Sequence, residues 1–496
     1  MLTRRAALAF VLGVVALAAT WAVFLTIPAG LRLRAVRWTA PRATRDPAAP
    51  LQFRSDGSFQ ISIFEDLHFG ENAWEHWGPQ QDLNSVCVME SVLDAEQPDL
   101  VVLNGDLITG ENTFRANSTA YVGQIVAPMI RRTVPWASTY GNHDSDFNLS
   151  RTALLAREQQ QKPAGLARTV NMLPDAPHAG VTNYYLPVYG SDCHMHTGSS
   201  SGGVSDNDGR CIPLLILWFF DSRGGFEYQQ KDAATGARIG KENWVDSAAV
   251  AWFETTQAAL LAKYARAIPS LAFVHIPPNV VYALQMDSTA PAGGGIDPHR
   301  QPGINDDKPL AQQAQGWCED GTNGPIEAKA STTGCAYGGQ DGPFMRAVAH
   351  SGNGTGVIAL FSGHDHGDTW CHTWEAGHTV PGAGVPGTGV HICFGQHTGY
   401  GGYGTWTRGA RQVLVTESSL AAAAAARRRP VVDTWIRLET GAVVGRVSLN
   451  ATYGQDAYPA TPDTHTHCPT CDSGPQQAPK LQVQNGKKAK EGWKQI

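Results

Sequence analysis

The 496-residue sequence lacks a strong net charge of either sign and any stripe of basic residues interleaved with aromatic ones. It holds 38 Lys and Arg against 44 Asp and Glu, a formal net charge of −6. That charge is small for so long a chain, so nucleic acid is not an expected partner. A complete Cys/His zinc shell is also missing, because the cluster from His465 to Cys471 offers only one half-site. We interpret that cluster as a local disulfide or part of a solvated tail.

Hydrophobic residues make up 42% of the chain, so it can build a real core. The length permits two or three domains, and a single large α/β domain with long loops fits equally well. Residues 31–50 are rich in Arg, Pro and Ala without hydrophobic periodicity, which predicts a linker. The folded body is predicted over 51–455. The polar, lysine-ended segment 456–496 is predicted to be a disordered tail.

The amino terminus carries Arg4 and Arg5, followed by an uncharged, mostly apolar stretch over residues 6–27. This stretch is long enough to cross a bilayer, whereas residues 16–18 offer a small-residue cleavage site. Residues 1–30 are therefore predicted to be either a signal peptide or a signal anchor. In both cases we expect the body in the secretory pathway, either secreted or on the lumenal or extracellular side of a membrane that only this segment touches.

Two further features favour that compartment. Four asparagines match the glycosylation acceptor pattern, namely Asn117, Asn148, Asn353 and Asn450. Nine cysteines are present, several as local pairs in glycine-rich loops: Cys87, Cys193, Cys211, Cys318, Cys335, Cys371, Cys393, Cys468 and Cys471. In an oxidising compartment such loop pairs indicate disulfides. Cys193 with Cys211, and Cys318 with Cys335, could each close the base of a loop.

Five short apolar runs have the composition of buried β-strands: Phe59–Phe64, Leu100–Leu103, Trp136–Tyr140, Leu271–Val274 and Val357–Phe361. After the first run, an apolar stripe at helical spacing ends at a proline, and it consists of Leu83, Val86, Met89, Val92 and Leu93. Another strand-like run over 214–220 precedes a predicted helix over 250–267. Strands that alternate with helices indicate an α/β sheet architecture.

Each of the five runs ends in a short block of polar, metal-ligating residue types. The blocks are Asp66-Leu67-His68, Gly105-Asp106, Gly141-Asn142-His143-Asp144, His275 and Gly363-His364-Asp365-His366. Ligands at the carboxyl ends of strands converge on one rim of a sheet. A single block of this kind is usually structural, but all five in order predict the ligand set of a two-metal hydrolytic site.

The order and spacing of the blocks resemble the calcineurin-like metallophosphoesterases, and within them the one-domain relatives of the purple acid phosphatases. The resemblance spans Asp66 to His366, about three fifths of the chain. It implies two facing mixed β-sheets flanked by helices, a four-layer α/β/β/α fold with long loop insertions. Only about fifteen residues separate the expected start of the fold at Leu51 from Asp66, so no additional amino-terminal β-sandwich is expected there. Residues 51–455 are thus expected to be a catalytic domain.

The resemblance also implies a ligand set. Asp66, His68 and His366 would bind the first metal, and Asn142, His275 and His364 the second. Asp106 would bridge the two ions. The set contains no thiolate, so it suits Fe, Mn or Zn, and the sequence does not choose among these.

By the same resemblance, His143 would lie above the metal pair, hold phosphoryl oxygens and protonate the leaving group. Asp144 is the expected carboxylate that orients and charges this imidazole. Asp365 and Glu65 are expected to point away from the metals. Among the histidines outside the blocks, His397 in a glycine-aromatic loop is the best candidate for a substrate contact.

One position departs from the true purple acid phosphatases, which carry a tyrosine ligand three residues after the bridging aspartate. This chain has Thr109 there. A tyrosinate colour and a fixed ferric ion are therefore not implied. The closest resemblance is to the colourless fungal and plant branch, which includes secretory-pathway phosphoprotein phosphatases.

The leading hypothesis is a dinuclear-metal phosphomonoesterase that acts by attack of a metal-bound hydroxide on a phosphate ester, with phosphoproteins as a possible substrate. A phosphodiesterase acting on nucleotides or lipid head groups is the alternative within catalysis. A phosphate- or glycan-binding module without turnover is the alternative outside it. Two long insertions, 155–210 and 285–342, are predicted to be partly ordered loops that overhang the site and crowd the second arm of a diester.

Overall fold

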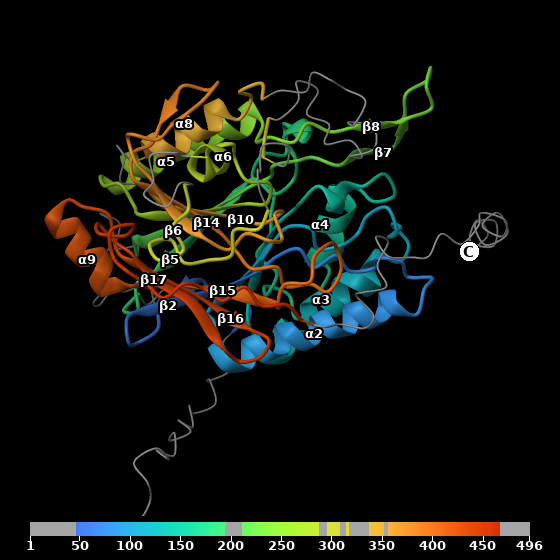
Figure 1. Ribbon diagram of the computed structural model, residues 1–496, viewed down its shortest axis with the longest axis horizontal. Coiled ribbons are helices and arrows are strands. Elements are labelled where there is room, and N and C mark those ends of the chain that lie inside the picture. Colours follow the sequence, from blue (N-terminus) through green and yellow to red (C-terminus); the bar gives the residue numbers. More distant parts are fainter. Residues whose placement is uncertain are drawn as a thin grey trace, which may run out of the picture. The chain divides into compact units, whose positions relative to one another are not determined.

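The computed structural model describes residues 46–193, 211–286, 295–307, 314–316, 337–351 and 356–466. Two mixed β-sheets lie face to face, and helices cover the outer face of each (Figure 1). This four-layer α/β/β/α arrangement confirms the predicted fold class. The predicted signal or anchor segment lies outside the described residues, as do Cys318, Cys335 and the cysteines of the tail.

The first sheet has the order β17-β16-β15-β2-β3-β4. Its parallel half consists of β2 (Ser58–Phe64), β3 (Leu100–Asn104) and β4 (Trp136–Thr139). Its antiparallel half consists of β15 (Gly409–Thr416), β16 (Val432–Leu438) and β17 (Val443–Leu449). The last two strands form the hairpin that turns at Gly441, whose φ of +83° suits glycine.

The second sheet has the order β1-β5-β6-β9-β10-β14-β11. Its strands are β1 (Leu51–Gln52), β5 (Tyr184–Tyr189), β6 (Pro213–Phe220), β9 (Ser270–Val274), β10 (Val357–Ser362), β11 (Cys371–Trp374) and β14 (Val390–Phe394). The central strands β6, β9, β10 and β14 are parallel. Two small hairpins complete the strands: β7 (Phe226–Lys231) with β8 (Arg238–Gly240), and β12 (Thr379–Val380) with β13 (Val385–Pro386).

The helices fall into two groups. Those beside the first sheet are α2 (Trp77–Glu96), α3 (Ser118–Arg132) and α4 (Arg151–Gln159), and those beside the second are α5 (Ser247–Tyr264), α6 (Val280–Gln285) and α8 (Gly342–His350). A further helix, α9 (Glu417–Ala426), contains the alanine run. The described elements also include the 3₁₀ turns η1 (His143–Ser145) and η2 (Pro177–Ala179).

Side-chain alternation along the strands builds the layers. In β6, Leu215, Leu217 and Phe219 pack in the core between the sheets, whereas Ile216, Trp218 and Phe220 pack against the helices. Strand residues that are apolar on both faces are what a sheet buried on both sides requires. Phe219 stacks on Phe273 at 5.1 Å between ring centroids, and that ring stacks on Phe361 at 5.6 Å. This stack joins the three strands across the middle of the inter-sheet core.

The buried face of α2 differs from the predicted stripe. Leu83 is 56% exposed, while Asp82 and Ser85 are buried. Asp82 accepts hydrogen bonds from the backbone N–H of Gly70, and Ser85 Oγ accepts one from Tyr400 N. These polar residues face inward because they accept hydrogen bonds from backbone N–H groups of two loops. A pattern of apolar residues in the sequence cannot reveal such bonds.

Two predicted segment boundaries change. The first part of the 155–210 insertion supplies β5, which pairs with β6 inside the second sheet. Residues 456–466, predicted as tail, are part of the folded body: Thr407 N donates to Thr464 O, and Thr466 N donates to Thr405 O. The folded body thus extends to residue 466, because non-local pairing of this kind leaves no hydrophobic periodicity in the sequence.

Two disulfides are present among the described residues. Cys193–Cys211 closes the base of one insertion, as predicted. Cys371 and Cys393 face each other across the antiparallel pair β11 and β14 and are buried. Among the described helices, none is both long and apolar enough to span a bilayer.

We expect the double substitution Cys371→Ala/Cys393→Ala to lower the free energy of unfolding by about 3 kcal/mol or more. The reason is that opening a loop of 22 residues frees the unfolded chain and leaves a small cavity in the core. Urea unfolding of the oxidised proteins measures the change. The control Cys87→Ala, at an exposed free thiol, should change stability by less than about 0.5 kcal/mol. Equal stability of both variants would contradict the expectation.

Candidate metal centre

The five polar blocks meet where the parallel strands of both sheets end. Asp66 and His68 follow β2, Asp106 follows β3, and Asn142 follows β4. His275 follows β9 in the other sheet, and His364 and His366 follow β10. The structure therefore brings the predicted ligand blocks to one rim, as expected from the carboxyl ends of parallel strands.

Ligand atoms gather in two neighbouring groups, and a third group of Asp106, His68 and His143 links them. Those of Asp66, His68 and His366 lie within 4.8 Å of one another, and so do those of Asp106, His275 and His364. Asp106 Oδ2 lies 3.0 Å from His275 Nε2 and 3.9 Å from His68 Nε2. Asp106 thus lies between the two groups, which is where a bridging carboxylate belongs.

Asn142 is held beside Asp106 by its neighbours. The N–H of His143 donates to Asp106 Oδ1 at 2.8 Å, and Gly141 lies directly against the same carboxylate. The Asn142 Oδ1 atom is buried and has no hydrogen-bond partner among the described residues. A buried amide oxygen without a donor is costly unless a cation or donor reaches it.

Four of these residues adopt a left-handed backbone conformation that is rare outside glycine. Asp66, His68, Asp106 and His364 have φ values of 54°, 49°, 48° and 75°. Such conformations cost on the order of 1–3 kcal/mol each and cluster at functional sites. They persist because the loops bond to one another: Leu67 N and His68 N both donate to Asp106 O, and His364 N donates to the Asp66 carboxylate.

Two glycines let the loops approach the histidine rings. A Cβ on Gly105 would lie 2.3 Å from the ring of His275. A Cβ on Gly402 would lie 2.5 Å from His366 and 2.8 Å from His68. Both glycines have positive φ, so any side chain would be strained as well as crowded.

Two histidines have the orientation that a metal ligand needs. Nδ1 of His275 donates to Asn104 O, and Nδ1 of His366 donates to Tyr403 O, each at 2.8 Å. Each ring therefore presents Nε2 to the carboxylates, and His366 Nε2 lies 3.6 Å from Asp66 Oδ1. A ligating histidine commonly donates its other ring N–H to a carbonyl in this way. Because His68 Nε2 also faces His366 Nε2 at 3.3 Å, the residues fit cations between them.

Electrostatics support the same interpretation. Burial, aided by the neighbouring His143 and His275, lowers the pKa values of His68 and His364 to about 3, so both rings are neutral at pH 7. Burial acts to raise the pKa of Asp106, but His275 and His143 hold it well below its usual range. Neutral imidazoles beside an ionised carboxylate are the protonation states that bind metals. Burial acts to lower the pKa of His275, but Asp106 and Asp66 raise it to about 9, so this ring must give up its Nε2 proton when a metal binds.

His143 lies at the mouth of the cluster, 36% exposed, with its ring 4.9 Å from that of His68. Its Nδ1 atom lies 3.0 Å from Asp146 Oδ2 and 3.5 Å from Glu111 Oε2. Burial acts to lower the pKa of His143, but Asp106 and Asp146 raise it well above its usual value. The ring is therefore cationic at neutral pH.

Asp144 does not orient His143, contrary to the prediction. Its carboxylate is buried and accepts hydrogen bonds from the backbone N–H groups of Leu107, Ile108 and Gly141. It fixes the two loops that carry Asp106 and Asn142. Asp146 and Glu111 take the predicted place. Asp146 could have been found from the sequence, because residues i and i+3 share a face in a 3₁₀ turn, but the approach of Glu111 depends on how two loops pack.

The remaining candidates lie around the cluster. His397 is 1% exposed and packs at a tilt against His366, with 3.9 Å between ring centroids, so it supports a ligand ring and is shielded from solvent. Asp365 is buried and belongs to neither ligand group. Glu65 accepts a hydrogen bond from Asn104 behind the cluster.

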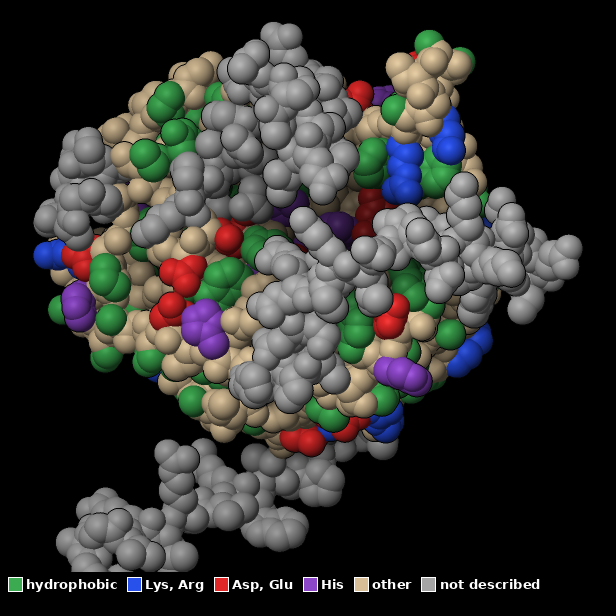
Figure 2. Space-filling view, turned by 45° about the vertical axis from the view of Figure 1, so that its right-hand side comes forward, with side chains coloured by type: hydrophobic (Ala, Val, Ile, Leu, Met, Phe, Trp, Pro, Cys, Tyr) green, Lys and Arg blue, Asp and Glu red, His purple; other side chains and the backbone are tan. Residues whose placement is uncertain are grey.

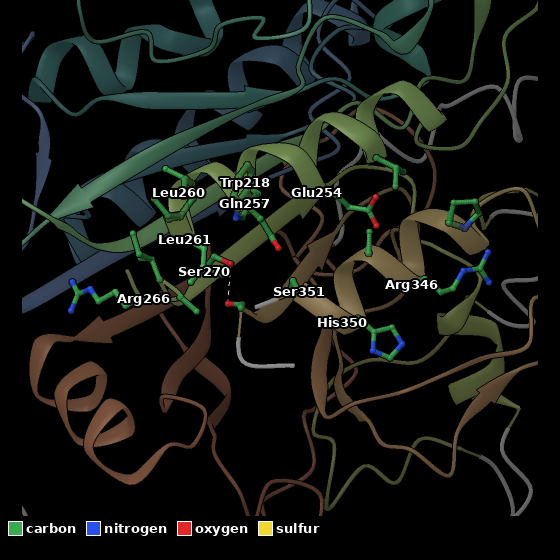
Figure 3. A pocket seen from close by; sticks show the side chains of 18 residues that line it. Trp218, Glu254, Gln257, Leu260, Leu261, Arg266, Ser270, Arg346, His350 and Ser351 are labelled. Atoms are coloured by element: carbon green, nitrogen blue, oxygen red, sulfur yellow. Dashed lines mark hydrogen bonds between the residues drawn. The ribbon is translucent and has the colours of Figure 1, made fainter. Parts of the chain in front are cut away.

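A groove of about 610 Å³ lies elsewhere, between α5 and α8 (Figure 3). Its walls are mostly apolar, with Arg346 and His350 along one side. It contains none of the predicted site residues, and no cluster of ligand-type side chains lines it. We assign it no part in the chemistry.

Comparison with known proteins identifies the family. The chain is 26% identical to the "probable inactive purple acid phosphatase 28" of Arabidopsis thaliana over 82% of this chain and 86% of the relative. Phosphatase DCR2 of Saccharomyces cerevisiae is 27% identical over 49% of this chain and 38% of its own length. A solved dimetal phosphatase from Danio rerio aligns over 79% of this chain and 98% of its own, with a TM-score of 0.42 and 13% identity. The family model for calcineurin-like phosphoesterases matches residues 64–368, more than half of the sequence, so the chain belongs to the calcineurin-like phosphoesterase family.

Proposed function

We propose that this chain is a dinuclear-metal phosphatase that hydrolyses phosphate monoesters. The observation that carries the proposal is the convergence of six ligand-type side chains around Asp106, with His143 at the open side of the cluster. The names of some relatives describe those proteins as probably inactive, and these names do not describe the site of this chain. Here every residue type that the chemistry needs is present and brought to one rim.

The proposed metal ligands are Asp66, His68 and His366 on one side and Asn142, His275 and His364 on the other, with Asp106 between them. When bound, two metal ions supply Lewis acidity that activates water and neutralises charge on the phosphoryl oxygens. The donor set of carboxylate, amide and imidazole suits Fe, Mn or Zn.

The chain's own contribution centres on His143. Its charged ring faces the open side, where it can hold a phosphoryl oxygen and then donate a proton to the leaving oxygen. Burial and the adjacent Glu111 raise the pKa of Asp146 to about 8. Burial acts to raise the pKa of Glu111 too, but Asp146 and His143 lower it below its usual range. The pKa values of the two carboxylates thus move in opposite directions, and the pair presents negative charge to His143.

We also propose a location in the secretory pathway. The two disulfides are compatible with an oxidising compartment, where such bonds form and persist.

The first functional prediction is that the purified protein holds two metal ions per chain and loses activity on an aryl phosphate after chelation. Asp106→Asn should lose both ions, because this carboxylate lies between the two ligand groups. Elemental analysis measures the content, and Asp365→Asn is the control, since Asp365 is equally buried but belongs to neither ligand group. An active wild-type protein with a single metal would overturn the prediction.

The second prediction is that His143→Ala lowers kcat by roughly 10²–10⁴-fold for esters with poor leaving groups and leaves the metal content unchanged. The loss should shrink for a very acidic leaving group, because less protonation is needed. Steady-state kinetics across a series of aryl phosphates measures this. A loss that is equal for all leaving groups would reject the acid role and leave His143 as a phosphate-binding residue.

The third prediction concerns the carboxylates beside His143. The double variant Glu111→Gln/Asp146→Asn removes the negative charge that favours the cationic ring, so the pKa of His143 falls and its proton is lost at lower pH. The alkaline limb of the kcat profile should therefore move to lower pH, and either single variant should move it less, because one carboxylate remains.

Asp144→Asn provides the contrast for this experiment. Its carboxylate holds backbone N–H groups and not the ring, so its loss should lower the melting temperature without moving the alkaline limb. If the double variant left the limb in place, the carboxylate pair would have no role in charging His143.

A further inference from the structure

The hairpin formed by β7 and β8 extends from the folded body (Figure 1). Its turn is closed by Asp232, whose N–H donates to Ala237 O and whose carboxylate accepts from Ala234 N and Thr235 N. Most of its residues are exposed, including Tyr228 and Ile239. A self-capped hairpin with exposed faces is available for contact with a partner.

The base of the hairpin rests on the loop that carries Asn142 and His143. Ser145 Oγ donates to Gly224 O at 2.8 Å, and Gln229 N donates to Phe147 O at 2.9 Å. A Cβ on Gly225 would lie 2.2 Å from Asn142 O, so the two segments are in close contact. The hairpin is therefore fixed relative to the proposed catalytic loop.

Two basic side chains lie next to each other on this hairpin, one on each strand. Lys231 and Arg238 are paired in register, and both lie over the ring of Phe147, at 5.6 Å and 5.0 Å from its centroid. Stacking on an aromatic ring orders a basic side chain and leaves its charge available. Phe147 follows His143 by four residues, a length of chain that reaches at most about 14 Å.

Neither cation is neutralised by a carboxylate within the described part of the chain. Two neighbouring cations have such partners: Lys241 pairs with Glu227, and Arg223 pairs with Glu242 and Asp246. No ion pair to Lys231 or Arg238 forms among the described residues. Figure 2 shows basic side chains next to a hollow in which histidine and acidic side chains are visible.

We propose that Lys231 and Arg238 form a docking site for acidic residues that flank the phosphorylated residue of a protein substrate. The inference rests on the proposed phosphatase function and adds the substrate class. An extended peptide advances about 3.3 Å per residue, so carboxylates roughly three to five residues from the phosphate reach the hairpin while the phosphate lies at the metal centre. An arginine and a lysine side by side carry the opposite charge to such carboxylates. The planar guanidinium of the arginine can also donate two parallel hydrogen bonds to one carboxylate.

The test compares three substrates on the metal-loaded full-length protein: an aryl phosphate, a phosphoserine peptide with acidic residues three to five positions from the phosphate, and the same peptide with glutamines there. Lys231→Gln/Arg238→Gln should reduce kcat/KM for the acidic peptide by about 3–20-fold, mainly through KM, and the effect should weaken at high salt. Activity on the aryl phosphate and the glutamine peptide should stay within about twofold.

The matched control is Arg427→Gln/Arg428→Gln, which removes the same charge at the end of α9, away from the hairpin in Figure 1. It should leave all three substrates unchanged. If wild-type protein does not hydrolyse the aryl phosphate, the proposed function fails. If it does, but acidic and glutamine peptides are equivalent or both double variants lose equally, the docking site is rejected. A preference for a 5′-phosphorylated oligonucleotide over both peptides would also reject it.

Discussion

Asp106 holds the candidate metal centre together through both its backbone and its side chain. Its carbonyl accepts the N–H groups of Leu67 and His68, and its carboxylate accepts that of His143 and contacts His275 from the opposite sheet. Loops after β2, β3, β4 and β9 therefore meet at one buried residue with a left-handed backbone. The facing sheets set how close these loops come, so the packing of the inter-sheet core determines the geometry of the centre.

This arrangement has an electrostatic consequence. Asp66, Asp106 and Glu65 are fully or almost fully buried, and removing carboxylates from water is expensive unless positive charge compensates them. His143 supplies part of that charge, but the buried oxygen of Asn142 has no hydrogen-bond partner among the described residues. In the proposed enzyme, cations complete this compensation. Metal affinity and the stability of these loops are then coupled, because the strained backbone at four ligands is held partly by what the ligands bind.

The sequence predicted the residues whose roles follow from local pattern. Strand runs ending in aspartate or histidine place those side chains at a rim, and alternation in β6 predicts a sheet buried on both faces. The features that the sequence did not predict depend on packing between segments that are distant in the chain. Glu111 reaches His143 only because two loops meet. Ser85 is buried because it bonds Tyr400, more than three hundred residues later, and residues 456–466 join the body by pairing with the loop around Trp406. Asp144 was assigned wrongly because adjacency in the chain suggested contact with His143, while a 3₁₀ turn sends its side chain the other way.

One short segment links the proposed chemistry to the proposed recognition. Residues 142–148 carry a ligand, the proposed acid, the carboxylate beside it and the ring on which the two hairpin cations stack. The contact between Gly225 and the Asn142 carbonyl leaves no space for either segment to shift independently. Arg151 reinforces the junction by donating to Gly141 O and Arg223 O, one on each segment. The hairpin cations therefore have a fixed position relative to the metal ligands, which is what reading residues at a set distance from a phosphate requires. A flexible arm could attract acidic substrates but could not select that spacing.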